Sequence, residues 1–226
     1  MTMDISVVIP TRDRAHYLAA AVASVKAQTR PASAVIIVDD GSCDDTATIV
    51  QGLDPSVIYV YQENAGAGAA RNAGAKLVET EFLAFLDSDD IWVPEKLAWQ
   101  TSALAAAPDP AMVFGHAAHF VSAELSPEEA ARLKFDPAPM PAISPSAILI
   151  RTADFHRVGP FDVALATGEF IEWYARARAL NIASCVLPQI VMHRRLHGGN
   201  MGRTGNRAHY ARALKAVIDQ RRKVQE

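Results

Sequence analysis

The first half of the chain alternates between short apolar runs and amphipathic segments. Three apolar runs rich in β-branched residues, at 5–9, 35–38 and 57–61, and a fourth made of Phe, Leu and Ala, at 82–86, are typical of strands buried on both faces. Helical spacing of apolar residues predicts helices at residues 16–28, 44–50 and from the small-residue stretch 64–74 to about 79. Strands that alternate with helices predict an α/β fold with a mostly parallel central sheet and helices on both faces.

The second half has a weaker pattern. We expect helices at residues 94–107, 152–157, 169–180 and 207–224 and strands at residues 112–120, 147–150 and 183–187. Residues 122–145 are rich in proline and carry no strong period, apart from a short helical piece at 127–133. We interpret this segment as a long excursion over the surface, because proline and irregular spacing disfavour regular elements.

Polar side chains follow three of the predicted parallel strands at the point where each strand ends. They are Thr11-Arg12-Asp13, Asp39-Asp40 and Asp87-Ser88-Asp89-Asp90. Ligands of such sheets collect beyond the carboxyl ends of the strands, so this topology gathers the three groups at one rim. We therefore predict a single site there.

The cluster at residues 87–90 holds three carboxylates in four positions. Carboxylates this close repel one another, and a divalent cation with oxygen ligands relieves that repulsion. Mg²⁺ or Mn²⁺ takes one or two protein carboxylates and fills its other positions with water and phosphate oxygens, which points to a nucleoside diphosphate. The alternative is that Asp87, Ser88 and Asp90 only form a turn and cap the helix that starts near Pro94.

Composition excludes several classes of protein. Of 226 residues 50% are hydrophobic and 21% charged, which is ordinary for a globular domain, and no apolar run is long enough to span a membrane. The N-terminus enters a strand-like segment at once, so we expect no signal sequence and a cytoplasmic protein. Cys43 and Cys185 fit no metal or redox spacing, and we expect no disulfide.

The net charge of −3 hides a basic C-terminus, which has nine Lys or Arg against two acidic residues from Arg194 onward. The helix predicted at 207–224 could contact an anionic membrane face peripherally, form a homodimer or pack on the domain. Without interleaved aromatic residues or a known module, we expect no nucleic-acid partner.

Four segments in this order resemble the family 2 glycosyltransferases: SVVIPTRDR (6–14), VIIVDDGSCDDT (35–46), NAGAGAARNAG (64–74) and FLDSDDIWVPEKL (85–97). The likeness continues more loosely through GPFD (159–162) and RRLHGGN (194–200). The resemblance implies one GT-A domain over 1–226, with a Rossmann-like sheet. It divides into a nucleotide-binding half (1–107), an acceptor-binding half (108–200) and a C-terminal basic helix (201–226).

The resemblance also implies a nucleotide-sugar site formed by Pro10, Thr11, Arg12, Asp39, Asp40, Gly66, Arg71, Asp87, Ser88, Arg194 and Arg195. Asp40 would accept the base N–H and so favour uracil or thymine. Asp89 would bind Mn²⁺ or Mg²⁺ directly and Asp87 would lie near the ribose and the metal. His197 would add a metal contact or a hydrogen bond, unless it is only a surface histidine in a glycine-rich loop.

One position departs from the family pattern. Members typically carry Glu-Asp at the start of the helix near residue 169, and that Asp is the general base that deprotonates the acceptor hydroxyl. Here Phe170 stands in its place. Glu169 or Glu172 could take the role, with Glu169 preferred, although either could simply be a carboxylate favoured by the helix dipole.

The leading hypothesis is a metal-dependent, inverting glycosyltransferase that moves a sugar from a UDP-sugar or dTDP-sugar to an unidentified saccharide, lipid-linked, protein or small-molecule acceptor. The alternative is a catalytically degenerate member that binds a nucleotide sugar or a partner without turnover. A sugar-phosphate nucleotidyltransferase or a dehydrogenase would need a glycine-rich loop after the first strand, where this chain has Pro10-Thr11-Arg12-Asp13.

Overall fold

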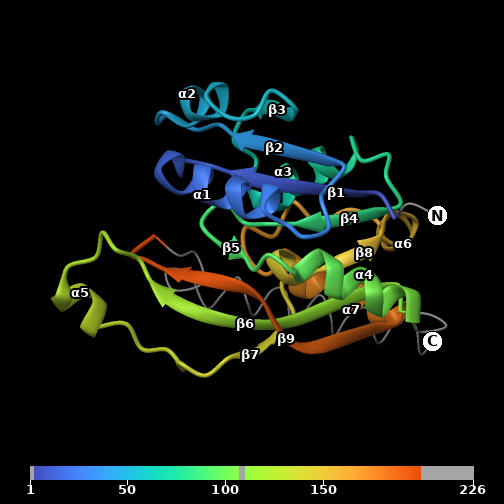
Figure 1. Cartoon of the computed structure of the whole chain (residues 1–226). Coiled ribbons are helices and arrows are strands. Elements are labelled where there is room, and N and C mark those ends of the chain that lie inside the picture. Colours follow the sequence, from blue (N-terminus) through green and yellow to red (C-terminus); the bar gives the residue numbers. More distant parts are fainter. Residues whose placement is uncertain (1–2, 107–109, 200–226) are drawn as a thin grey trace.

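A computed structural model describes residues 3–106 and 110–199, in which one long sheet runs through both halves of the molecule (Figure 1). In the first half β1 (Ile5–Thr11), β2 (Ala34–Asp40), β3 (Val57–Gln62) and β4 (Phe82–Phe85) pair in parallel in the order β3-β2-β1-β4. The crossovers are α1 (Ala15–Lys26), α2 (Thr46–Gln51) and α3 (Ala67–Ala75). This arrangement confirms the predicted α/β fold.

The sheet continues beyond β4 with mixed pairing, in the order β4-β8-β6-β9-β5. These strands are β8 (Leu149–Arg151), β6 (Met112–Val121), β9 (Ser184–Leu196) and β5 (Ile91–Trp92), and β7 (Met140–Ala142) pairs with β6. The remaining helices are α4 (Lys96–Ala106), α5 (Pro127–Ala131), the 3-10 turn η1 (Pro145–Ala147), α6 (Thr152–Val158) and α7 (Glu169–Ala179).

The small residues of α3 let this helix lie close to the sheet. A Cβ atom on Gly74 would come within 2.4 Å of Val8 Cγ1, in the wholly buried strand β1. No larger side chain fits there without displacing the strand, because the core is close-packed. At its other end, the first residues of α3 line the same cavity as Thr11 and Asp40, where β1 and β2 end.

Three strands differ from the sequence prediction. β9 extends to Leu196, well past the expected end at residue 187, and β5 and β7 occupy segments predicted as loops. β9 pairs with β6 over most of its length despite Pro188 and its charged residues, so tertiary pairing overrides its weak local pattern. β5 and β7 are only two and three residues long, too short to show a period.

The cysteines and the predicted C-terminal helix can also be compared with the structure. Cys43 and Cys185 are both free, as expected. The helix predicted at 207–224, and with it the membrane and dimer predictions, lies outside the described residues. Within the described residues, no helix combines the length and the apolar character needed to cross a membrane.

Candidate active site

A cavity of about 1150 Å³ opens where β1, β2 and β4 end, at the predicted rim. Its walls also include the start of α3, the segment around β7 and η1, and the start of α7. The sequence-predicted site residues that line it are Pro10, Thr11, Arg12, Asp40, Gly66, Arg71, Asp87, Ser88, Asp89, Glu169 and Arg194. Asp39, Glu172, Arg195 and His197 do not line it.

The carboxylate of Asp40 holds the loop that leads into α3. Its Oδ1 accepts hydrogen bonds from Gln62 Nε2 (2.7 Å) and the Ala65 N–H (2.8 Å), and its Oδ2 accepts the Gly66 N–H (2.8 Å). Gly66 has a φ of 93°, a conformation that favours glycine. Because a carboxylate has about four acceptor positions, one remains for a ligand at the cavity.

Asp39 fixes the neighbouring turn from behind the cavity. Its Oδ1 accepts the Ser42 N–H at 2.8 Å and its Oδ2 accepts the Tyr59 hydroxyl at 2.7 Å. Burial and the Asp39 carboxylate together raise the pKa of Tyr59 above its usual value, so the phenol stays a donor. The structure therefore gives Asp39 a supporting contact and leaves Asp40 facing the cavity.

Thr11 ends β1 with a buried hydroxyl. Its Oγ1 has no hydrogen-bond partner within the described residues, and the residue lines the cavity. An unsatisfied buried hydroxyl costs free energy, which a ligand hydrogen bond would recover.

The buried guanidinium of Arg71 bridges the two halves of the molecule through two ion pairs. Its Nη2 lies 2.6 Å from Asp87 Oδ1 and its Nη1 lies 2.7 Å from Glu169 Oε1. Burial alone would lower the pKa of Arg71, but the two carboxylates outweigh it and raise the pKa above its usual value. The guanidinium therefore stays charged and holds Asp87 and Glu169 on either side of itself.

Asp89 points toward the basic end of the cavity. Its Oδ2 accepts a hydrogen bond from His197 Nε2 at 2.9 Å and lies 4.0 Å from Arg14 Nε. His197 Nδ1 accepts the Gly199 N–H, so the ring proton belongs on Nε2. Burial raises the pKa of Asp89, but the contacts with His197 and Arg14 outweigh it and keep the pKa below its usual value.

Asp90 and Arg195 support the acidic turn from inside. Asp90 is buried and accepts the Arg195 N–H at 3.1 Å; burial, and then the charges of Asp89 and Asp87, raise its pKa well above the usual value. The Arg195 guanidinium lies 4.6 Å from the ring centroids of both Tyr17 and Phe120, and its Nε donates to the Asp89 carbonyl.

Arg194 and Arg195 separate because successive side chains of a strand point to opposite faces. Arg194 is exposed and lines the cavity, whereas Arg195 packs behind the acidic turn. The sequence predicted both arginines as binding residues, but only Arg194 lines the cavity, and Arg195 supports the acidic turn from behind.

The end of β4 offers two carboxylates as candidate ligands of a divalent cation. The Asp87 and Asp89 side chains are 34% and 21% exposed and both line the cavity. Among the described residues, no three His, Cys, Asp or Glu side chains form a ready metal-binding group. Mg²⁺ and Mn²⁺ suit such a site because they take one or two carboxylates and leave the other positions to phosphate and water.

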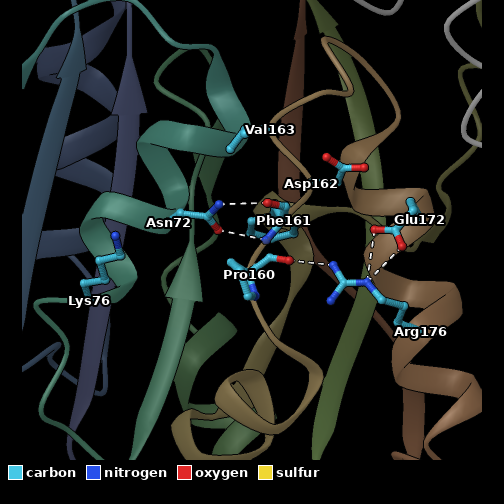
Figure 2. A pocket seen from close by; sticks show the side chains of 8 residues that line it. All are labelled: Asn72, Lys76, Pro160, Phe161, Asp162, Val163, Glu172 and Arg176. Carbon is cyan, nitrogen blue, oxygen red and sulfur yellow. Dashed lines mark hydrogen bonds and ion pairs between the residues drawn. The ribbon is translucent and has the colours of Figure 1, made fainter.

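Glu172 faces a separate hollow of about 520 Å³, shown in Figure 2. Its carboxylate pairs with Arg176 Nε at 2.9 and 3.1 Å, and Arg176 also donates to the carbonyls of Val158 and Pro160. Glu169 and Glu172, weighed together from the sequence, thus lie in different places, and only Glu169 reaches the large cavity.

Sequence reasoning missed other residues that line the cavity or support it. Ser146 Oγ accepts the Asp87 N–H at 3.0 Å, and its carbonyl accepts Trp92 Nε1 at 2.7 Å. Arg14 is the last residue of the segment SVVIPTRDR, so its position shortly after the end of the first strand could have been read from the sequence. Ser146 lies between the proline-rich segment 122–145 and the strand predicted at 147–150, where no pattern marked it.

The order of the parallel strands, the cavity at their ends and the antiparallel continuation through β8 define an α/β protein of the GT-A type. The chain belongs to glycosyl transferase family 2, whose family model matches residues 6–136.

Curated relatives agree with this family. An uncharacterized glycosyltransferase of Rickettsia typhi is 28% identical over 193 residues, which are 79% of this chain and 60% of the relative. An Escherichia coli protein named UDP-Glc:alpha-D-GlcNAc-diphosphoundecaprenol beta-1,3-glucosyltransferase is 36% identical over 100 residues, 43% of this chain and 40% of the relative. The chain therefore spans less than two thirds of the length of these relatives.

The fold also resembles solved structures of S. aureus TarS. The structure of TarS residues 1–349 in complex with UDP matches with a TM-score of 0.72 at 21% identity, covering 95% of this chain and 64% of that chain. A structure of the same protein in complex with UDP-GlcNAc matches with a TM-score of 0.70 at 22% identity, and the match covers 90% of this chain and 62% of that chain. Likeness at this identity establishes the fold.

Proposed function

We propose that this chain transfers a glycosyl group from a UDP-sugar, or a dTDP-sugar, to an acceptor hydroxyl with inversion and with the help of a divalent cation. The observation that carries the proposal is the pair of accessible carboxylates, Asp87 and Asp89, at a strand end inside one cavity with Thr11 and Asp40. The E. coli relative is named for a UDP-Glc donor and TarS was crystallised with UDP, which supports this donor class.

The nucleoside would lie between β1, β2 and the start of α3. Asp40 has one acceptor position left for the N–H of uracil or thymine, and Thr11 Oγ1 has no described partner. Arg12 and Arg194, both exposed on the cavity wall, would attract the diphosphate electrostatically. These contacts would orient the anomeric carbon toward α7.

A bound Mn²⁺ or Mg²⁺ would neutralise the charge that develops on the departing diphosphate. Asp89 would hold the cation, and Asp87 would be kept in place by Arg71 and by the Ser146 hydroxyl. His197 would orient the Asp89 carboxylate through its hydrogen bond, as supporting residues of metal ligands commonly do.

Glu169 is the proposed general base. Its Oε1 is held by Arg71, and no described residue bonds to its Oε2, which is therefore the oxygen that could accept the acceptor proton. Because Arg71 binds Asp87 as well, it would hold the Glu169 carboxylate at a fixed distance from the carboxylate of Asp87, which faces the donor. Glu172 is engaged with Arg176 outside the cavity and would serve the packing of α7 instead.

The test is UDP release from a panel of UDP-sugars and dTDP-sugars with Mn²⁺ or with chelator. We expect release to require the cation and Asp89, and Glu169→Gln to lower turnover about 10²- to 10⁴-fold without loss of UDP binding. Glu128→Gln, on the exposed helix α5, is the matched control and should leave turnover unchanged. Full turnover by Glu169→Gln would remove its proposed role.

One observation favours a second candidate, a nucleotide-sugar binder without turnover. Phe170, at the family position of the base, is 6% exposed and packs among Phe114, Trp173 and Tyr174. Cation-dependent UDP binding with no UDP release from any donor or acceptor would support this candidate over transfer.

A further inference from the structure

Beside its acidic end, the cavity has an uncharged mouth. Two segments form it, residues 140–145 (MPAISP) and 163–168 (VALATG), and none of their twelve positions carries a charge. Apart from Ser144 and Thr167, the two segments consist of Met, Pro, Ala, Ile, Val, Leu and Gly, so apolar atoms dominate this part of the wall. We name this region the apolar mouth.

Four large aliphatic side chains are exposed at the apolar mouth. Met140 and Ile143 are 48% and 45% exposed on one wall, and Val163 and Ile171 are 60% and 41% exposed on the other. A single exposed aliphatic residue needs no explanation, but a cluster around one opening marks a surface that a ligand covers.

The apolar mouth is continuous with the reaction end of the cavity. Glu169, Phe170 and Ile171 are consecutive at the start of α7, and all three line the cavity. The wall thus changes within three residues from a carboxylate to an aromatic ring and then to an aliphatic side chain. Phe170 stands at the family position of the Asp and is 6% exposed, so the wall beside the proposed base carries no second carboxylate at this position.

We propose that the acceptor is an amphiphile, in which a hydroxyl-bearing polar head lies at Glu169 and an attached alkyl chain lies along the apolar mouth. The inference rests on the proposed function, because the head is placed by the donor site. An alkyl chain is favoured over a longer saccharide, because the most exposed side chains there are aliphatic and only Ser144 and Thr167 offer hydroxyl groups as partners. It is favoured over an aromatic group because the four exposed side chains are aliphatic, and the ring of Phe170 is only 6% exposed and leaves little face for stacking.

The test compares three probes with the same head group, methyl, octyl and phenyl β-glucoside. Each is titrated below its critical micelle concentration into the full chain with UDP and Mn²⁺ present, and UDP binding is measured in the same preparation. Because each buried methylene favours binding, we expect octyl β-glucoside to bind at least about tenfold more tightly than the methyl probe.

Met140→Ser with Ile143→Ser should remove most of this octyl preference and leave UDP affinity unchanged. The matched control is Ile58→Ser, which changes a similarly exposed aliphatic residue on β3 away from the cavity. It should leave both affinities as they are.

Each result separates the two proposals. Equal affinity for the octyl and methyl probes, with UDP bound, overturns the amphiphile inference and leaves the proposed function standing. Tighter binding of the phenyl probe than of the octyl probe overturns the choice of an alkyl chain. Octyl preference without any UDP binding overturns the proposed function and leaves the apolar mouth as a binding surface.

Discussion

Lys96 is a wholly buried lysine beneath the site. Its Nζ donates to Gln100 Oε1 at 2.7 Å and to the Ile148 carbonyl at 3.3 Å, and lies 3.9 Å from the Trp92 ring centroid. Burial lowers its pKa well below the usual value, because no carboxylate contacts the amine in the described residues. Lys96 and Gln100 thus bind the backbone near η1, which carries Ser146.

The lowered pKa predicts a pH dependence of stability. Between the folded-state pKa and 10.5 the unfolded chain holds a proton on Lys96 that the folded chain has lost, so the free energy of unfolding rises with pH in that window. Urea unfolding of wild type and Lys96→Met from pH 7 to 10 measures this. We expect the wild-type value to rise relative to the variant, by up to about 1.4 kcal/mol per pH unit. If the free energies of unfolding of wild type and variant change with pH in parallel, the lowered pKa of Lys96 is contradicted.

Single residues show how far sequence could locate the site. The sequence predicts acidic residues at the ends of strands, because the apolar runs stop directly before them. Asp40, Asp87 and Asp89 all line the cavity, as predicted. The sequence could not tell Asp39 from Asp40, or Arg194 from Arg195, because adjacent positions differ only in which face of the strand they occupy. Nor could it show that Arg71 would pair with Asp87 and Glu169, which lie far apart in the chain.

At the scale of elements, the turn at residues 159–161 is clamped to two helices. Asn72 of α3 exchanges hydrogen bonds with the Phe161 backbone, donating to its carbonyl at 2.9 Å and accepting its N–H at 2.8 Å (Figure 2). Arg176 of α7 binds the Pro160 carbonyl from the other side. The clamp sets Phe161 below Arg71, whose guanidinium carbon lies 6.0 Å from the ring centroid.

Removal of the Asn72 amide should therefore destabilise the fold. Asn72→Ala leaves the Phe161 N–H and carbonyl without their partner, and we expect a loss of about 1–3 kcal/mol in the free energy of unfolding. Lys76→Ala changes an exposed residue of the same hollow and should stay within about 0.5 kcal/mol of wild type. Chemical denaturation measures both, and equal stability of the two variants would refute the clamp.

Sequence patterns predicted the elements that have a clear period. The four parallel strands and the helices between them follow from buried apolar runs and helical spacing. β5, β7 and the second half of β9 were missed, because they are short or charged and are strands through pairing with neighbours from other parts of the chain. The sequence of each segment alone does not show which distant strand it pairs with.

At the scale of the whole molecule, the buried Arg71 guanidinium ties the parallel half to α7 by its ion pairs with Asp87 and Glu169, of which only the second is buried. Arg71→Met would leave the buried Glu169 carboxylate without its partner, whereas Asp87 can be hydrated, and we expect a loss of about 3 kcal/mol in the free energy of unfolding. Arg151→Met breaks the exposed pair with Glu81 and should cost no more than about 1 kcal/mol. Similar losses for the two variants, measured by urea unfolding, would contradict a coupling role for Arg71.

The measurement that tests the account most directly is calorimetric titration of UDP into wild type and Asp89→Ala, each with Mn²⁺ and with chelator. The account predicts that UDP binds wild type with Mn²⁺, and that binding weakens at least about tenfold when either the cation or the Asp89 carboxylate is removed. UDP binding that is indifferent to both would contradict a cation held at the end of β4. Absence of UDP binding under every condition would contradict the nucleotide site itself.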